Sequence, residues 1–145
     1  HDSSLSAGIH CILAQDIGYA AEAYGYLKQA ARMDLDDVNR NTFNGVHSAC
    51  QGSTYMMIVN GYAGMRDHDG KLHFKPAIPE HWKGYRFKIC YRGSRFAVDV
   101  DQKGVHPVGG QTPGGGLRRQ RGLRGGRKTG VLRLRRVNHV RSCDI

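Results

Sequence analysis

The chain has 145 residues, about the length of one ordinary domain, and a net charge of +10. The charge is uneven, because residues 1–105 hold 12 Lys and Arg against 11 Asp and Glu, whereas residues 106–145 hold 10 Lys and Arg and one acid, Asp144. Four widely spaced cysteines favour neither a disulfide scaffold nor a zinc site, and no run reaches the roughly 18 apolar residues of a membrane span. We therefore expect reduced thiols, a cytoplasmic location and no membrane partner.

The first 32 residues predict two helices joined at Gly18. Asp2, Ser3 and Ser4 are residue types that cap helix N-termini, and apolar residues recur behind them at helical spacing until the glycine. The stretch "YAAEAYGYLKQAARMD" then places small and apolar residues on one face and charged residues mostly on the other. An antiparallel helical hairpin is the natural prediction.

A third helix is predicted after a polar loop. The segment "DLDDVNRNTFNGVHSA" is rich in Asn and Asp, which favour loops and caps, so we interpret Asp36 and Asp37 as turn residues and not as a catalytic carboxylate pair. The next segment, "SACQGSTYMMIVNGYAGM", is apolar nearly all round, as expected for a helix that is buried on several sides.

From Lys71 onward the apolar residues recur every second position. "YRFKICYR" and "RFAVDVD" alternate apolar and polar residues around Gly93 and Ser94, which predicts a β-hairpin with one solvated face. A short strand is predicted over residues 72–74. Because an isolated hairpin is marginally stable in water, we expect further strands beside it.

Two polar stretches are candidates for an anion site. "HDSSLS" places the hydroxyls of Ser3 and Ser4 at the start of a helix, where unpaired N–H groups and the helix dipole favour phosphate. "NTFNGVHS" places His47 at the start of the third helix. The alternatives remain that one serine caps its helix and that His47 is structural. The eight histidines show no H-x-x-x-H or H-E-x-x-H spacing, so we predict no metal site.

Several motifs in one order resemble a known family. "HDSSLS", "AARMDLDD", "NTFNGVHSA", "VNGYAGMR" and "GKLHFKPAIPEHWKGYRFKICYRG" are together similar to the C-terminal part of the glycoside hydrolase family 65 disaccharide phosphorylases, over about residues 1–103. The resemblance implies a mixed fold, α then β. Residues 1–66 would be the last helices of an (α/α)6 catalytic barrel and residues 67–105 the first strands of a C-terminal β-sandwich, before a basic tail at 106–145.

The same resemblance implies a reaction and a site. Family members cleave an α-glucosidic disaccharide, such as maltose, trehalose or kojibiose, with inorganic phosphate and inversion, to β-glucose 1-phosphate and a free sugar, and they need no cofactor. Ser3, Ser4 and His47 match the positions that bind the phosphate. The catalytic glutamate is expected upstream of His1, so the chain alone is expected to be inactive. A trehalase-like hydrolase remains the alternative, and a homodimer is expected for the complete enzyme.

The tail after Gly104 leaves two interpretations open. It holds no Phe, Tyr or Trp, and its Gly and Arg residues follow no period, so we expect disorder from about residue 106. Out-of-frame translation of a GC-rich coding sequence would give this composition. The rival is a basic arm that, attached to a non-enzymatic helical module, binds nucleic acid nonspecifically through its arginines.

Overall fold

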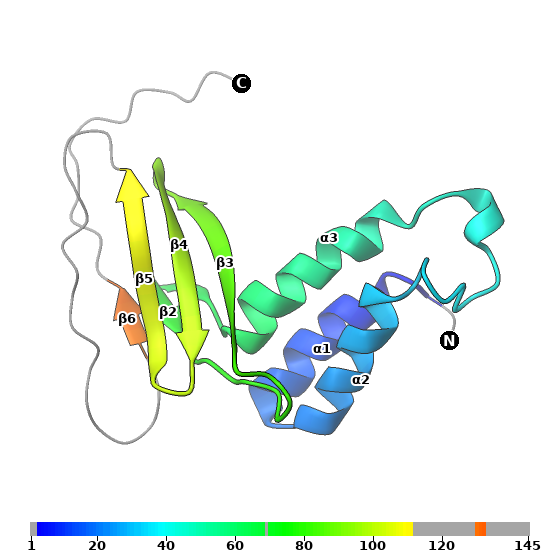
Figure 1. Ribbon diagram of the computed structural model, residues 1–145, viewed down its shortest axis with the longest axis horizontal. Coiled ribbons are helices and arrows are strands. Elements are labelled where there is room, and N and C mark those ends of the chain that lie inside the picture. Colours follow the sequence, from blue (N-terminus) through cyan, green and yellow to red (C-terminus); the bar gives the residue numbers. More distant parts are fainter. Residues whose placement is uncertain (1–2, 69, 112–129, 133–145) are drawn as a thin grey trace. The chain divides into compact units, whose positions relative to one another are not determined.

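The computed structural model describes residues 3–68, 70–111 and 130–132. The chain divides into two compact units, His1–Met65 and Arg66–Ile145, the first helical and the second built of strands (Figure 1). This order confirms the predicted fold class, α then β. No helix within the described residues is long and apolar enough to cross a membrane.

The helical unit begins with the predicted hairpin. Helix α1 spans Ser6–Ile17 and ends at Gly18, whose φ of 88° is the left-handed conformation that glycine adopts readily. Helix α2 spans Ala20–Ala31 and runs back beside α1. The predicted serine cap of α1 is wrong, because the N-cap position is Leu5 and no side chain caps it. Instead, a turn precedes the helix, and the Ser6 N–H donates to the carbonyl oxygen of Ser3 at 3.4 Å.

The third helix changes character along its length. Helix α3 spans Ser48–Met56 and continues as the π-helical segment η2, Met57–Tyr62. Met57, Val59 and Tyr62 are buried in η2, whereas Cys50 is the buried residue of α3. The expectation of a helix buried on several sides therefore holds for η2 but not for α3. Between α2 and α3, a 3-10 turn, η1, spans Thr42–Asn44.

Small residues form the contact between the helices. Buried positions on α1 and α2 are Ala7, Gly8, Cys11, Ala14, Ala23, Leu27 and Ala30. Four large residues spaced four apart, the N-cap residue and three residues of α1, lie on the other side of the helix and are 54–66% exposed: Leu5, Ile9, Leu13 and Ile17. We call these four residues the α1 ridge. Helix α1 thus has two apolar faces, and the one with small side chains packs within the unit.

The second unit contains two three-stranded antiparallel sheets. One has the order β1-β2-β6, from Arg66–His68, Lys71–Phe74 and Gly130–Leu132. The other has the order β3-β4-β5, from Gly84–Tyr91, Ser94–Asp101 and Gly104–Gln111. The predicted hairpin is β3-β4, with Phe87 opposite Val98 and a turn at Arg92 and Gly93, both at positive φ. Phe87, Phe96, Val98 and Val100 are buried, as the alternation predicted.

The start of the predicted tail differs from the structure. We expected disorder from residue 106, but β5 continues to Gln111 and pairs with β4, and residues 130–132 pair with β2 as β6. Backbone hydrogen bonds to an existing strand stabilise an added strand whatever its side chains, and composition does not report them. The rest of the predicted tail lies outside the described residues.

Candidate functional site

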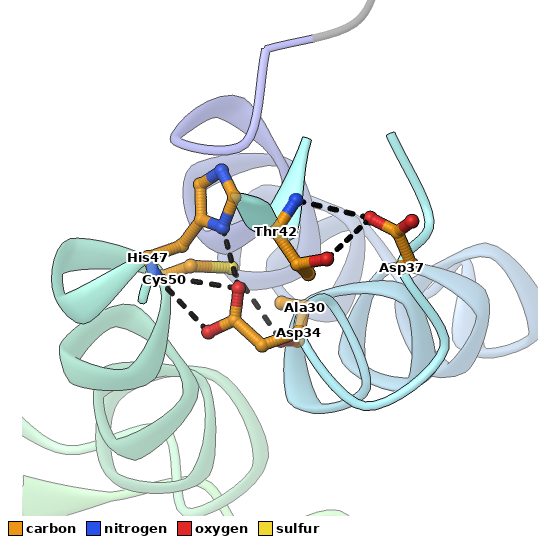
Figure 2. A network of polar contacts seen from close by, with 6 residues as sticks. All are labelled: Ala30, Asp34, Asp37, Thr42, His47 and Cys50. Atoms are coloured by element: carbon orange, nitrogen blue, oxygen red, sulfur yellow. Dashed lines mark hydrogen bonds and ion pairs between the residues drawn. The ribbon is translucent and has the colours of Figure 1, made fainter. Parts of the chain in front are cut away.

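The loop between α2 and α3 is organised by three aspartates. At its start the Arg32 guanidinium donates two hydrogen bonds of 2.5 Å to the carboxylate of Asp36. Asp37, at a φ of 46°, accepts from the Thr42 N–H at 3.1 Å and from the Thr42 hydroxyl at 2.9 Å (Figure 2). The hydrogen bonds to Thr42 lower the pKa of Asp37. Asp36 and Asp37 therefore act as the turn residues that the sequence predicted.

The third aspartate, Asp34, binds His47. Its carboxylate accepts the His47 backbone N–H at 3.1 and 3.3 Å, and one of its oxygens lies 2.5 Å from Nδ1 of the imidazole (Figure 2). Both side chains are about one-fifth exposed, at 20% for Asp34 and 18% for His47. The hydrogen bond from His47 holds the pKa of Asp34 below its usual range. Asp34 is thus an ionised acceptor at the start of α3.

A buried thiol fastens α3 beneath this pair. The Cys50 Sγ–H donates to the Ala30 carbonyl oxygen in α2 at 3.4 Å, and burial raises the pKa of Cys50 (Figure 2). A thiol with a raised pKa stays protonated near neutral pH and is a poor nucleophile. We conclude that Cys50 has a structural role, since its hydrogen bond joins the first turn of α3 to the last turn of α2.

The first and third helices run in the same direction. Gly8 in α1 lies against Ser53 in α3, where a Cβ added to Gly8 would be 2.7 Å from the Ser53 Cβ. Further along both helices, Ile12 in α1 lies against Gly61 in η2, which continues α3. Because both contacts advance together, the N-termini of α1 and α3 point to the same end of the unit. The positive ends of two helix dipoles therefore share one end.

All three predicted phosphate-binding residues lie at that end. Ser3 and Ser4 are half-buried in the turn before α1, and His47 is the N-cap residue of α3. No hydrogen bond between His47 and either serine is found within the described part of the chain. The arrangement brings hydroxyl and imidazole groups to two helix starts, where the helix dipoles favour an anion. At α3 the N–H groups of His47, Ser48 and Cys50 already donate to Asp34, Val46 and His47.

Sequence reasoning missed Asp34 as part of this site. The motif "AARMDLDD" contributed to the resemblance, but no role was assigned to its first aspartate. Asp34 and His47 are 13 residues apart, and only the folded loop brings them together. The available signal was a run of acids a short loop away from a histidine at a predicted helix start.

Comparisons with known proteins follow the same division of the chain. Residues 1–56 match the model of the glycosyl hydrolase family 65 central catalytic domain, and residues 65–107 match that of the family 65 C-terminal domain. The chain is 44% identical over 105 residues to alpha,alpha-trehalose phosphorylase of Thermoanaerobacter brockii and 40% identical over 105 residues to maltose phosphorylase of Bacillus subtilis. Each alignment covers 72% of this chain and 14% of the relative, so the chain spans about a seventh of the relatives it matches.

A solved structure supports the same relationship. The protein "Putative kojibiose phosphorylase from human microbiome" matches with a TM-score of 0.71 and 36% identity, over 77% of this chain and 15% of that protein. The relatives also include an uncharacterized glycosyl hydrolase of Mycobacterium tuberculosis, 35% identical over 113 residues. That alignment covers 78% of this chain and 14% of the hydrolase.

Proposed function

Because the chain belongs to glycoside hydrolase family 65, we propose that it forms the phosphate-binding side of an inverting disaccharide phosphorylase. In this reaction a phosphate oxygen attacks the anomeric carbon of an α-glucoside as the glycosidic C–O bond breaks. A protonated oxygen leaves on the free sugar, and the other product is β-glucose 1-phosphate. The relatives named as trehalose, maltose and kojibiose phosphorylases support this reaction class without selecting a disaccharide.

The observation that carries the proposal is the common end of α1 and α3. Ser3 and Ser4 precede one helix start, and His47 caps the other. Inverting glycosidases use a carboxylate base to activate water, but phosphate is already an anionic nucleophile. A cradle of N–H, hydroxyl and imidazole groups can therefore take the place of that base. The proton donor would come from a glutamate elsewhere in the complete enzyme, as the family resemblance implies.

A chimeric enzyme tests the proposal. Residues 1–105 of this chain would replace the matching segment of the trehalose phosphorylase of Geobacillus stearothermophilus, which is 46% identical over 105 residues. We expect the chimera to release glucose 1-phosphate from trehalose only when phosphate is present. Ser3→Ala and His47→Ala should each lower phosphate-dependent turnover by about tenfold or more, since each removes a hydrogen bond to a charged group.

The control is a second histidine of the helical unit. His10 lies on the exposed side of α1 with its ring 5.3 Å from that of Tyr26, so His10→Ala should leave turnover unchanged. Wild-type turnover in both the Ser3 and His47 variants would contradict the phosphate site.

Hydrolysis is the second candidate, because one group of relatives carries the name glycosyl hydrolase. A hydrolase would release two free sugars at the same rate with and without phosphate. Product analysis in phosphate-free buffer therefore separates the two reactions.

Homodimer formation by the complete enzyme stays a prediction, and the arginines proposed to bind nucleic acid lie outside the described residues.

A further inference from the structure

One carboxylate holds both the backbone and the ring of His47. Asp34 accepts the backbone N–H of His47 and lies within hydrogen-bond distance of Nδ1. A cap for the backbone alone would leave the imidazole free to rotate. Because it also contacts the ring, Asp34 fixes the orientation of the His47 imidazole as well as the backbone at the start of α3.

The loop that carries Asp34 is itself fixed on both sides of the contact. The bond between Arg32 and Asp36 brackets Asp34 in sequence, and the bonds between Asp37 and Thr42 close the same loop before it reaches His47. Figure 2 shows the two aspartates on separate partners, Asp34 on the imidazole and Asp37 on Thr42. The hydrogen bonds on both sides of Asp34 thus hold the loop in place, so the Asp34 carboxylate lies in a fixed position beside His47.

The protonation states follow from the chemistry of the two groups. An ionised carboxylate can only accept hydrogen bonds, so Nδ1 of His47 must carry the hydrogen that lies between them. The imidazole is then held in one tautomer and one orientation. The remaining ring nitrogen, Nε2, points away from Asp34 (Figure 2).

We propose that Asp34 is a positioning residue of the phosphate site, which holds His47 as the Nδ1–H tautomer so that Nε2 faces the phosphate. This inference rests on the proposed function, because it assigns Asp34 a role only through His47. In that tautomer Nε2 accepts a hydrogen bond from a phosphate hydroxyl. The carboxylate does not touch the phosphate, which it would repel.

Imidazole NMR of the ¹⁵N-labelled 145-residue chain tests the tautomer directly. In the wild type we expect His47 to be the Nδ1–H form. The variant Asp34→Asn keeps an oxygen for the His47 backbone N–H, but its amide can donate to Nδ1, so the ring should shift toward the Nε2–H form. The matched control is Asp37→Asn, which removes the same charge from the same loop and should leave the tautomer unchanged.

Titration with inorganic phosphate gives the second readout. We expect Asp34→Asn to weaken the phosphate response of the His47 signals by about tenfold, the loss of one hydrogen bond, because a ring in the Nε2–H form cannot accept the phosphate hydroxyl. Binding by the His47→Ala variant and by the double variant would be followed by ³¹P NMR. Adding Asp34→Asn to His47→Ala should cause no further loss, because Asp34 acts through the ring.

The outcomes separate this inference from the proposed function. If His47 signals of the wild type ignore phosphate, or if His47→Ala binds phosphate as well as the wild type, the proposed function is contradicted, and with it the phosphate role of Asp34. If the wild type responds but Asp34→Asn leaves the tautomer unchanged, or weakens binding further in the His47→Ala background, only the positioning role of Asp34 is overturned.

Discussion

The contact between α1 and α2 in the helical unit and the sheet of β3, β4 and β5 in the strand unit bury different kinds of residues. The sheet of β3, β4 and β5 buries large side chains, Phe87, Phe96, Val98 and Val100, and exposes the polar residues between them. The contact between α1 and α2 buries mostly alanines, with Cys11 and Leu27, and leaves the larger α1 ridge exposed. Burying one large apolar side chain is worth about 1.5–3 kcal/mol, so the exposed ridge forgoes much of the stabilisation that the sheet obtains. The comparison indicates that the α1–α2 contact is organised for close approach of helices, while the largest buried side chains of the helical unit, Met33, Met57 and Tyr62, lie on other segments.

The largest expected effect is in the strand unit, at Gly84. An added Cβ there would lie 2.4 Å from the Val100 carbonyl oxygen, a backbone atom that cannot move without breaking the β3-β4 register. We expect Gly84→Ala to destabilise the sheet by more than about 3 kcal/mol, measured by hydrogen exchange of the β3 and β4 amides. Cys90, which is exposed on the same strand, is the control, and Cys90→Ala should have little effect. Unchanged amide protection in Gly84→Ala would contradict the close contact.

A smaller effect is expected in the helical unit, at Gly8. Its added Cβ would meet the Ser53 Cβ at 2.7 Å, whereas Gly25 in α2 has no heavy atom within 4 Å of the same position. We expect Gly8→Ala to lower the free energy of unfolding by about 1–3 kcal/mol, because α1 and α3 must separate. Gly25→Ala should raise it by about 0.5–1 kcal/mol through helix propensity. Denaturant titration followed by helical circular dichroism measures both changes. If Gly8→Ala raised the free energy of unfolding as Gly25→Ala does, the close contact of Gly8 with Ser53 would be refuted.

The smallest effect is expected at the α1 ridge. The double variant Ile9→Gln and Leu13→Gln should change the unfolding free energy of this chain by less than about 0.5 kcal/mol, because both side chains are 54% exposed. Leu27→Ala, at a residue only 4% exposed, should cost about 2–5 kcal/mol in the same assay. In the chimera described above, we expect the ridge variant to lose stability, since other helices of the catalytic domain would cover the ridge. If the ridge variant lowered the unfolding free energy of the chain alone as much as that of the chimera, the α1 ridge would already be packed within the chain.

The strand pattern was predictable because a strand has one simple period. Alternation placed Phe87, Phe96, Val98 and Val100 on one face, and the turn residues set the register. Helix α1 was harder, because both of its faces are apolar. The large apolar residues that recur at helical spacing in α1 mostly form the exposed α1 ridge, and the structure packs Ala7, Cys11 and Ala14 instead. Hydrophobic spacing finds a helix but does not say which of two apolar faces meets the rest of the unit.

The sequence by itself determined the change from helices to strands, the glycine that ends α1, the β3-β4 hairpin, the family, and the candidate residues Ser3, Ser4 and His47. Local propensity, periodicity and ordered motifs are all written along the chain, so they can be read without a structure. Only the tertiary structure decided that α1 and α3 start at one end, that α3 widens into η2, and that Asp34 holds His47. The common helix start and the contact of Asp34 with His47 depend on residues 13 to 49 positions apart, which are brought together by packing and loop closure and leave no local pattern.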